Sequence, residues 1–468
     1  MVMRQPASAQ PASDSGIESR YAWRRLLVSL AISTISGIGL WSVVVVMPPI
    51  QAEFGVDRAD ASLPYTATML GFAVGAIFMG RLSDRKGIVR PLTIGAVSLG
   101  LGYIAVSSAQ NLWQFTLAQG LLIGMAGCSV TFGPLVADVS HWFTRNRGIA
   151  VGICASGNYL AGAIWPPLIQ YLSQDWGWRG ALLSTGLFCA IAMLLLSLTL
   201  RRPSPVGHAD TVAHAAAKPA AHVNISPAAL QTLLAFAAVC CCLAMSMPQV
   251  HIVAYCSDLG YGVARGAEML SLMLAFGVIS RLASGWIADH IGGVRTLLLG
   301  SALQTLTLIF YLPFDGLTSL YIVSALFGLS QGGIVPAYAI IVREYFPAQQ
   351  AGARIGLIIT TSIVGMALGG WMSGAIFDMT GSYHWAFLNG ILWNLVNVAI
   401  ALWLLLQPRR AKLAPAVNDF GLVAHESECA QAVRLANVCI ADHAPFFVLA
   451  TYLIWDRSGN LQALLDRA

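Results

Sequence analysis

Long apolar stretches separated by short polar segments run through most of the chain. The hydrocarbon core of a bilayer is about 30 Å thick, and about 20 residues of α-helix cross it. Apolar windows of suitable length occur at 26–48, 63–80, 91–109, 112–137, 148–172, 180–200, 229–255, 267–289, 295–313, 318–342, 353–377 and 385–407. The pattern therefore predicts an all-α membrane protein with twelve transmembrane helices.

Composition and charge agree with this pattern and orient it. Apolar residues make up 57% of the chain and charged residues 10%, with a mean hydropathy of +0.70. Lysine and arginine gather on one side of the predicted helices, and the loops of the other side hold only Arg58, Arg179 and Arg265. Because positive loops stay cytoplasmic, we expect a multi-pass protein of the cell (inner) membrane with both termini in the cytoplasm. This bias explains the net charge of +5 without a nucleic-acid partner.

The segments outside the apolar windows suggest the domain organisation. Residues 1–24 are polar and predict a disordered cytoplasmic leader, while the first apolar window is too long for a signal-peptide core. We expect a six-helix bundle at 25–200, a flexible cytoplasmic linker at 201–228 and a second bundle at 229–410. The tail at 411–468 does not continue the helical pattern, and its role is unknown.

Two loop segments at equivalent places in the halves resemble each other. Gly80-Arg-Leu-Ser-Asp-Arg-Lys-Gly-Ile-Val-Arg90 and Gly285-Trp-Ile-Ala-Asp-His-Ile-Gly-Gly-Val-Arg295 share Gly, Asp, Gly, Val and Arg in the same register. This match indicates an internal duplication, hence two pseudo-symmetric six-helix bundles. Each Asp ends a helix and is expected to accept hydrogen bonds from a neighbouring helix N-terminus. The glycines allow a tight turn, and the arginines meet lipid headgroups. The residues assigned to this loop motif are Gly80, Asp84, Arg85, Gly87, Arg90, Gly285, Asp289, Gly292 and Arg295.

An ordinary inside-positive loop explains any one of these charges equally well, but not the repeat of the whole segment. The repeated segment resembles the loop signature of major facilitator superfamily transporters, although the expected basic pair after the second glycine is Ile88-Val89-Arg90 here. The resemblance covers about residues 25–410. It implies two six-helix bundles around a central substrate cavity and a rocker-type alternating-access mechanism.

A single arginine interrupts the apolar window at 267–289. A cation near the middle of a membrane segment costs about 2.5–3.5 kcal/mol, so Arg281 should face a protein interior or a watery cavity. On a helix it shares a face with Gly277 and Gly285, which leaves room for a ligand or a close helix. The alternative is a structural role in which Arg281 reaches toward the cytoplasmic end and pairs with Asp289 or with lipid headgroups, although about 12 Å of helix separates it from Asp289.

The stretch Ser280-Arg281-Leu-Ala-Ser-Gly285 resembles the monocarboxylate porter and oxalate–formate antiporter branch, in which an arginine at this place holds the substrate carboxylate. The planar guanidinium also matches a carboxylate bidentately. Two positions depart from relatives: Thr116 replaces an arginine of proton-coupled members, and Gly277 replaces an acidic residue of animal monocarboxylate porters. The resemblance thus leaves the coupling ion open.

Other polar residues inside the apolar windows are weaker candidates for binding substrate. His251 is the only histidine well inside a window; its imidazole titrates near neutral pH and suits proton coupling, although a structural role is as plausible. Core packing is an equally good reading of the rest. The complete set of predicted binding residues is Arg281, His251, Tyr255, Gln331, Tyr338, Asn158 and Thr131.

The leading hypothesis from the sequence is secondary active transport of a small organic anion, with a monocarboxylate as the first choice and alternating access as the mechanism. The alternatives are a facilitator or exporter of a neutral or amphipathic solute and, in another class, a non-transporting membrane sensor. The chain has no nucleophile–base cluster, metal-ligand spacing or ATP signature, so we expect no enzyme, metal or cofactor. Its expected partners are the small-molecule substrate, the lipid bilayer and protons as a coupling ion, and we expect a monomer.

Overall fold

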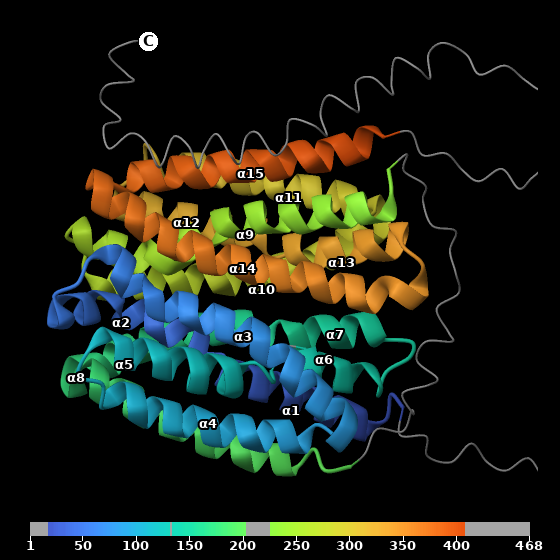
Figure 1. Ribbon diagram of the computed structural model, residues 1–468, viewed down its shortest axis with the longest axis horizontal. Coiled ribbons are helices and arrows are strands. Elements are labelled where there is room, and N and C mark those ends of the chain that lie inside the picture. The colour runs from blue at the N-terminus through green and yellow to red at the C-terminus, as the bar shows by residue number, and fades with distance from the viewer. Residues whose placement is uncertain (1–16, 132, 203–224, 408–468) are drawn as a thin grey trace, which may run out of the picture. The chain divides into compact units, whose positions relative to one another are not determined.

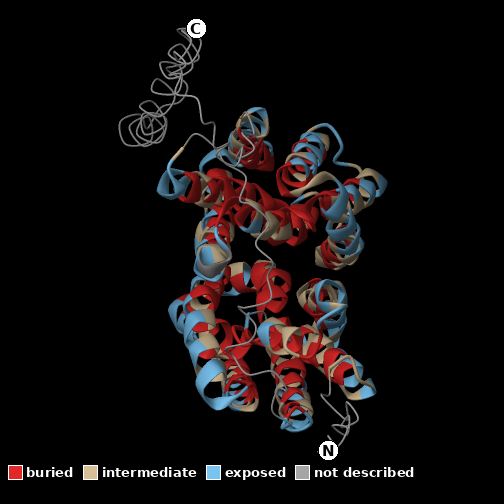
Figure 2. Cartoon of the chain, turned by 90° about the vertical axis from the view of Figure 1, so that its right-hand side faces the viewer, coloured by how far each residue is buried: buried red, intermediate tan, exposed pale blue. Residues whose placement is uncertain are grey.

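The computed structural model describes residues 17–131, 133–202 and 225–407, and these fold entirely as helices and connecting turns. The N-terminal half comprises α1 (Arg20–Ser36), α2 (Ile38–Phe54), α3 (Arg58–Lys86), α4 (Val89–Ser107), α5 (Leu112–Leu117), the π-helix η1 (Ala118–Cys128), α6 (Gly133–Ser140), α7 (Arg147–Ala155) and α8 (Gly157–Leu198). The C-terminal half comprises α9 (Pro227–Asp258), α10 (Val263–Ile291), α11 (Gly293–Phe310), α12 (Leu317–Gln331), α13 (Ile334–Tyr345), α14 (Ala348–Thr380) and α15 (Tyr383–Leu406). Helices of the two halves form two groups (Figure 1), and buried residues line the inside of each (Figure 2).

The twelve predicted membrane crossings agree with the observed helices when one long helical stretch is divided at a bend. Within the described residues, 11 helical stretches are long and apolar enough to cross a membrane. One of them, Arg147–Leu198, is 52 residues long and contains two predicted windows. Gly177 interrupts it with φ 64° and ψ 168°, a backbone conformation that a side chain would strain. The all-α fold with twelve membrane crossings is therefore confirmed.

The first helix begins earlier than the sequence pattern predicts. Residues up to 24 were expected to be a disordered leader, yet α1 starts at Arg20, where the Ser19 side chain accepts a hydrogen bond from Ala22 N. The helix continues toward its N-terminus because Arg25 is 3% exposed and forms a bidentate ion pair with Asp138 of α6. The expected linker meets α9 at Pro227, and its residues 203–224 lie outside the described part of the chain, as do residues 408–468 of the tail.

Close helix contacts within each half depend on glycine. A Cβ atom at Gly71 or Gly75 would collide with the backbone of η1, and one at Gly365 or Gly369 would collide with the backbone of α9. Small residues let helix backbones approach in this way, which compensates for the weak hydrophobic drive between helices in lipid.

The repeated loop motif produces the same turn twice. Gly87 follows α3 with φ 76°, and Gly292 follows α10 with φ 85°. Each glycine N–H donates to the carbonyl four residues earlier: Gly87 N lies 2.8 Å from Ser83 O, and Gly292 N lies 2.9 Å from Ala288 O. Because non-glycine residues rarely adopt such φ values, this turn gives a physical reason for the glycine in both repeats.

The buried ion pair between Arg25 and Asp138 should stabilise the N-terminal half. Asp138→Asn leaves the guanidinium without its carboxylate, and we expect the free energy of unfolding to fall by about 3–5 kcal/mol. Thermal denaturation of the purified protein in detergent measures this change. Arg265→Gln, which breaks an exposed pair with Glu268, is the control and should leave the denaturation temperature unchanged; equal losses in both variants would contradict the prediction.

Candidate functional site

Arg281 lies where the two halves of the chain meet. Its Nη1 donates to Ala155 O at 2.9 Å, and its Nε lies 3.4 Å from Gly332 O. The guanidinium carbon also lies 4.4 Å from the ring centroid of Tyr159. Ala155 ends α7 and Tyr159 belongs to α8, so this arginine of the C-terminal half is held mainly by the N-terminal half.

The break between α7 and α8 makes the Ala155 carbonyl available. A helix leaves its last four carbonyls without intrahelical partners, and Ala155 is the final residue of α7. No ion pair among the described residues involves Arg281, and the alternative partner Asp289 does not contact it. The carbonyls that accept from Arg281 are bonded by its Nη1 and Nε, and the side chain is half-buried.

The two glycines on the same face as Arg281 have different surroundings. A Cβ atom at Gly277 would lie 2.5 Å from Cδ1 of Tyr159, so this glycine serves a close helix contact and not a ligand. The ring of Tyr159 thus occupies the space where the resemblance leads one to expect an acidic side chain. A Cβ at Gly285, by contrast, would have no atom within 4 Å.

The predicted binding residues of the N-terminal half make local hydrogen bonds. Asn158 precedes Tyr159, and both its Oδ1 and its carbonyl accept from Trp41 Nε1, at 3.3 and 3.0 Å. Thr131 is buried and donates to Cys128 O at 2.6 Å, just after η1. Asn158 therefore lies beside the Arg281 site, whereas the hydroxyl of Thr131 is engaged with its own helix.

Gln331 and Tyr338 are engaged inside the C-terminal half. Gln331 Oε1 accepts from Gln249 Nε2 at 2.7 Å, and the residue precedes Gly332, whose carbonyl faces Arg281. The Tyr338 hydroxyl donates to Asn397 Oδ1 at 2.7 Å. Tyr338 is fully buried, so this hydrogen bond links α13 to α15 inside the C-terminal half.

His251 and Tyr255 lie in a second cluster, away from Arg281. The sequence predicted the two residues individually but not the cluster that they form. His251 Nδ1 lies 3.1 Å from the Tyr383 hydroxyl, and its Nε2 lies 2.7 Å from Gly370 O. Tyr255 packs edge-on against Tyr383, with ring centroids 5.3 Å apart. The same Tyr383 hydroxyl accepts a 2.7 Å hydrogen bond from Arg58 Nη1.

Arg58 connects the N-terminal half to three helices of the C-terminal half. Its Nη2 lies 3.1 Å from Asp258 Oδ1 at the end of α9, and its guanidinium lies 4.7 Å from the Phe377 ring of α14. In addition, the two carboxylate oxygens of Asp378 accept from Arg58 N at 2.9 Å and Ala59 N at 2.7 Å. We call Arg58, Asp258, Asp378 and Tyr383 the outer junction, since the charge distribution predicts this side to face outward. The only sequence signal was a lone arginine in a loop otherwise poor in positive charge.

The predicted loop motif lies at the opposite ends of α3 and α10. Asp84, Arg85, Arg90, Asp289 and Arg295 are all exposed there. At the start of α11, the amide of Gly293 donates to Glu344 Oε1 of α13 at 2.8 Å, so Glu344 binds the N-terminus of this helix.

Glycines near these inner ends face open space. A Cβ at Gly80, Gly152, Gly285 or Gly356 would meet nothing within 4 Å. The boundary between the two halves, here called the seam, is different at its outer side. There a Cβ at Gly374 would lie 2.9 Å from the backbone of Ala59. The halves are thus in contact at the outer junction, and these inner glycines are uncovered.

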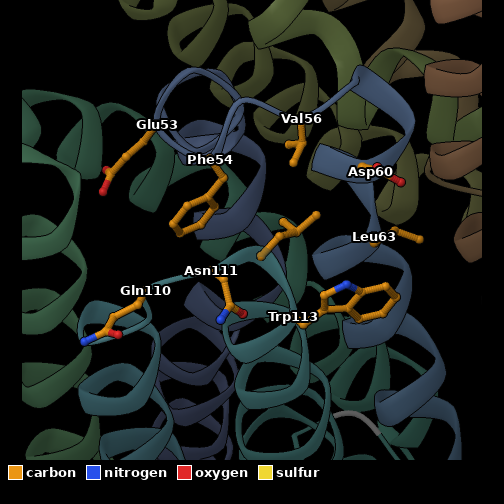
Figure 3. Close-up of a pocket in the computed structure, with 9 residues that line it drawn as sticks. Glu53, Phe54, Val56, Asp60, Leu63, Gln110, Asn111 and Trp113 are labelled. Atoms are coloured by element: carbon orange, nitrogen blue, oxygen red, sulfur yellow. The ribbon is translucent and has the colours of Figure 1, made fainter.

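One surface cavity of about 380 Å³ lies near the outer ends of α2, α3 and α5 (Figure 3). Its lining includes Glu53, Asp60 and Trp113 but none of the predicted binding residues. Glu53 already bonds Arg179 and Trp178. Among the described residues, no group of His, Cys, Asp and Glu side chains is arranged to hold a metal ion.

Comparisons with known proteins agree on one family. The profile of the Major Facilitator Superfamily matches residues 30–320 and 285–455. Monocarboxylate transporter 13 from Bos taurus is 28% identical over 331 residues, which cover 70% of this chain and 75% of that protein. The Agnestins efflux protein AgnL12 from Paecilomyces divaricatus is 24% identical over 357 residues, covering 75% of this chain and 80% of that protein.

A solved structure supports the same fold. A bacterial homologue of the human lysosomal transporter Spinster, in an inward-facing and occupied conformation, superimposes with a TM-score of 0.62 at 15% identity. The match covers 82% of this chain and 97% of the other chain.

The contact between Gly277 and Tyr159 can be tested by adding a single methyl group. Gly277→Ala should lower the free energy of unfolding by about 1–3 kcal/mol, because the Cβ overlaps the ring. Tyr159→Ala should remove most of this loss in the double variant, which thermal denaturation of all four proteins measures. Gly285→Ala, on the same helix but in open space, is the control and should not destabilise. Additive losses at Gly277 and Tyr159 would refute the contact.

Proposed function

Because the chain belongs to the major facilitator superfamily, we propose that it transports a small organic anion, a monocarboxylate, with Arg281 binding the carboxylate. The chain is a multi-pass membrane transporter, and the proposal concerns its substrate and its site. The observation that carries it is a half-buried guanidinium at the seam between the halves that takes part in no ion pair within the described residues.

The contacts of Arg281 suit a cation that exchanges partners. The Ala155 carbonyl and the Tyr159 ring satisfy the guanidinium without neutralising it. A carboxylate that reaches the guanidinium would form a charge-assisted hydrogen bond, with a second one beside it in a bidentate arrangement. The relatives named monocarboxylate transporters support this substrate class. Since Arg281 contacts both halves, an anion bound to it lies where alternating access requires a substrate.

Contacts at the two ends of the seam support alternating access. The outer junction holds α3 against α9, α14 and α15, while the glycines near the inner ends are uncovered. The two bundles, residues 25–200 and 229–410, are joined by the linker at 201–228. Rocking of one bundle against the other would separate the contacts of the outer junction and bring the surfaces around the inner glycines together. We further propose the cell (inner) membrane, cytoplasmic termini, a monomer and protons as the coupling ion.

A facilitator or exporter of a neutral or amphipathic solute is the second candidate. It is favoured by the Ala155 and Tyr159 contacts, which equally suit a structural Arg281 that joins the halves. A relative named as an efflux protein also fits this alternative. A membrane sensor without transport is the third candidate, and a chain that binds the anion but moves none of it would establish that role.

The substrate class is tested by uptake into proteoliposomes of labelled lactate, pyruvate, formate, oxalate, benzoate and one neutral sugar. We expect the wild type to take up at least one monocarboxylate. Arg281→Lys keeps the charge but loses the planar fork, so uptake should fall at least about tenfold, as loss of a charged hydrogen bond of about 1.5–3 kcal/mol implies. Arg281→Ala should abolish uptake.

Arg265→Lys is the matched control, since Arg265 lies on the same helix but pairs with the exposed Glu268. It should leave uptake unchanged. Undiminished acid uptake by folded Arg281→Lys, or uptake of the sugar and of no acid, would overturn the anion site but not the fold.

The inner glycines provide a separate test of alternating access. Gly285→Leu fills open space at the inner end of α10, so the protein should fold normally while closure at that end is blocked. We expect uptake to fall at least about tenfold, because a barrier of 1.4 kcal/mol already gives that factor. Binding of the anion, measured by calorimetry in detergent, should persist; normal uptake would show that the surface around Gly285 stays uncovered throughout transport.

A further inference from the structure

The hydrogen bonds around His251 have a fixed direction. Gly370 O only accepts, so His251 Nε2 carries a hydrogen and donates to it at 2.7 Å. Arg58 Nη1 only donates, so the Tyr383 oxygen accepts from it at 2.7 Å. The Tyr383 hydroxyl then has its own hydrogen to donate to His251 Nδ1, 3.1 Å away. The chain Arg58–Tyr383–His251–Gly370 is complete when the imidazole is neutral and Nδ1 is an acceptor.

From this geometry we propose that His251 Nδ1 is a proton-binding site whose occupancy opens the outer junction. The incoming proton takes the lone pair of Nδ1, which then donates instead of accepting. The Tyr383 hydroxyl loses its acceptor, and a positive imidazolium faces the guanidinium of Arg58 across a single oxygen atom. Both changes oppose the contact that holds α3 to the C-terminal half.

The surroundings of His251 supply little to neutralise a second positive charge. The helices packed against α9 bring Arg58 and the Tyr65 ring from α3, Asp378 from α14 and Tyr383 from α15, and α9 itself adds Tyr255 and Asp258. Asp258 and Asp378 are already engaged by Arg58, through its guanidinium and its backbone amide. No charged side chain of α2 or α10 takes part in the hydrogen bonds described for this chain of groups. His251 itself is fully buried.

The coupling is reciprocal by thermodynamic necessity. If protonation favours an open junction, a chain with an open junction binds the proton more tightly. A low pH on the outer side would therefore protonate His251 and, at the same time, favour the conformation in which Arg281 is accessible from that side. In the proposed transport, His251 would be the residue that couples transport to protons, and this part of the inference rests on the proposed function. The link between protonation and opening of the junction needs no substrate.

The test measures opening of the junction without any substrate. Thr66 of α3 lies two turns beyond Arg58, is half-buried, and its hydroxyl donates to Ala367 O of α14 at 3.0 Å, so separation of α3 from α14 should expose it further. A Thr66→Cys variant is treated with a membrane-impermeant maleimide between pH 8 and pH 5.5, on intact cells and on inverted vesicles. The chain without this substitution gives the background, and the described native cysteines are all buried. Gln110→Cys, at an exposed outer position, corrects for the pH dependence of thiol reactivity.

One linked proton changes an equilibrium by up to about tenfold per pH unit. We therefore expect the corrected labelling rate from the outer side to rise at least about tenfold as the pH falls to 5.5. His251→Gln supplies an amide that donates to Gly370 and accepts from Tyr383 but does not titrate, so the rise should disappear. Tyr383→Phe removes the hydroxyl that bridges Arg58 and His251, so it should give faster labelling at every pH and a smaller rise, which then comes only from repulsion between the imidazolium and Arg58.

His384→Gln is the matched control, because this exposed histidine follows Tyr383 and bonds Ser382 and Leu312 O. It should keep the full response. Labelling that does not depend on pH in the wild type, or an acid response that survives at full size in folded His251→Gln, would overturn the proposal. None of these outcomes depends on Arg281, so a failed anion site and a failed proton site are distinguished.

Discussion

Every charge inside a membrane protein must find its partners within the protein or in water, because lipid offers none. Three buried or half-buried arginines meet this constraint in different ways. Arg25 is neutralised by Asp138 within one half. Arg58 is neutralised across the seam by Asp258. Arg281 receives a carbonyl and an aromatic ring across the seam, but no carboxylate. In the proposed transport cycle, the three solutions correspond to a permanent contact, a releasable contact and a position for an incoming anion.

This division of roles follows from where each partner is anchored. A pair inside one half moves as a unit and does not sense the arrangement of the halves. A pair across the seam is broken whenever the halves separate, so its strength sets part of the balance between conformations. An arginine without a carboxylate partner can still form an ion pair, and a ligand can supply the negative charge. The burial of an arginine therefore does not show whether it takes part in a conformational change. Whether its partners lie in the same half or in the other half is the more informative observation.

The sequence predicts those features that depend on local spacing. Apolar window length located the crossings, and the repeated loop segment predicted turns that Gly87 and Gly292 make with nearly the same φ. Periodicity also put Gly277 and Arg281 on one face, but it could not say that Tyr159 fills the space beside them. The extension of α1 was missed because its cause, Asp138, is more than a hundred residues away in sequence. The outer junction was missed for the same reason, since Arg58, Asp258 and Tyr383 lie in separate loops and helix ends.

The cap of α3 has a consequence for how easily the seam opens at its outer side. Asp57 holds the N-cap position of this helix, yet its side chain makes no capping hydrogen bond, and Asp378 of the other half binds the first amides instead. Aspartate is a favourable N-cap residue. When Asp378 withdraws, the helix start keeps a carboxylate of its own at the residue adjacent to the freed amides. Separation thus lets Asp57 replace Asp378 as the acceptor for the Ala59 amide, so the start of α3 has a local substitute for one hydrogen bond that it gives up.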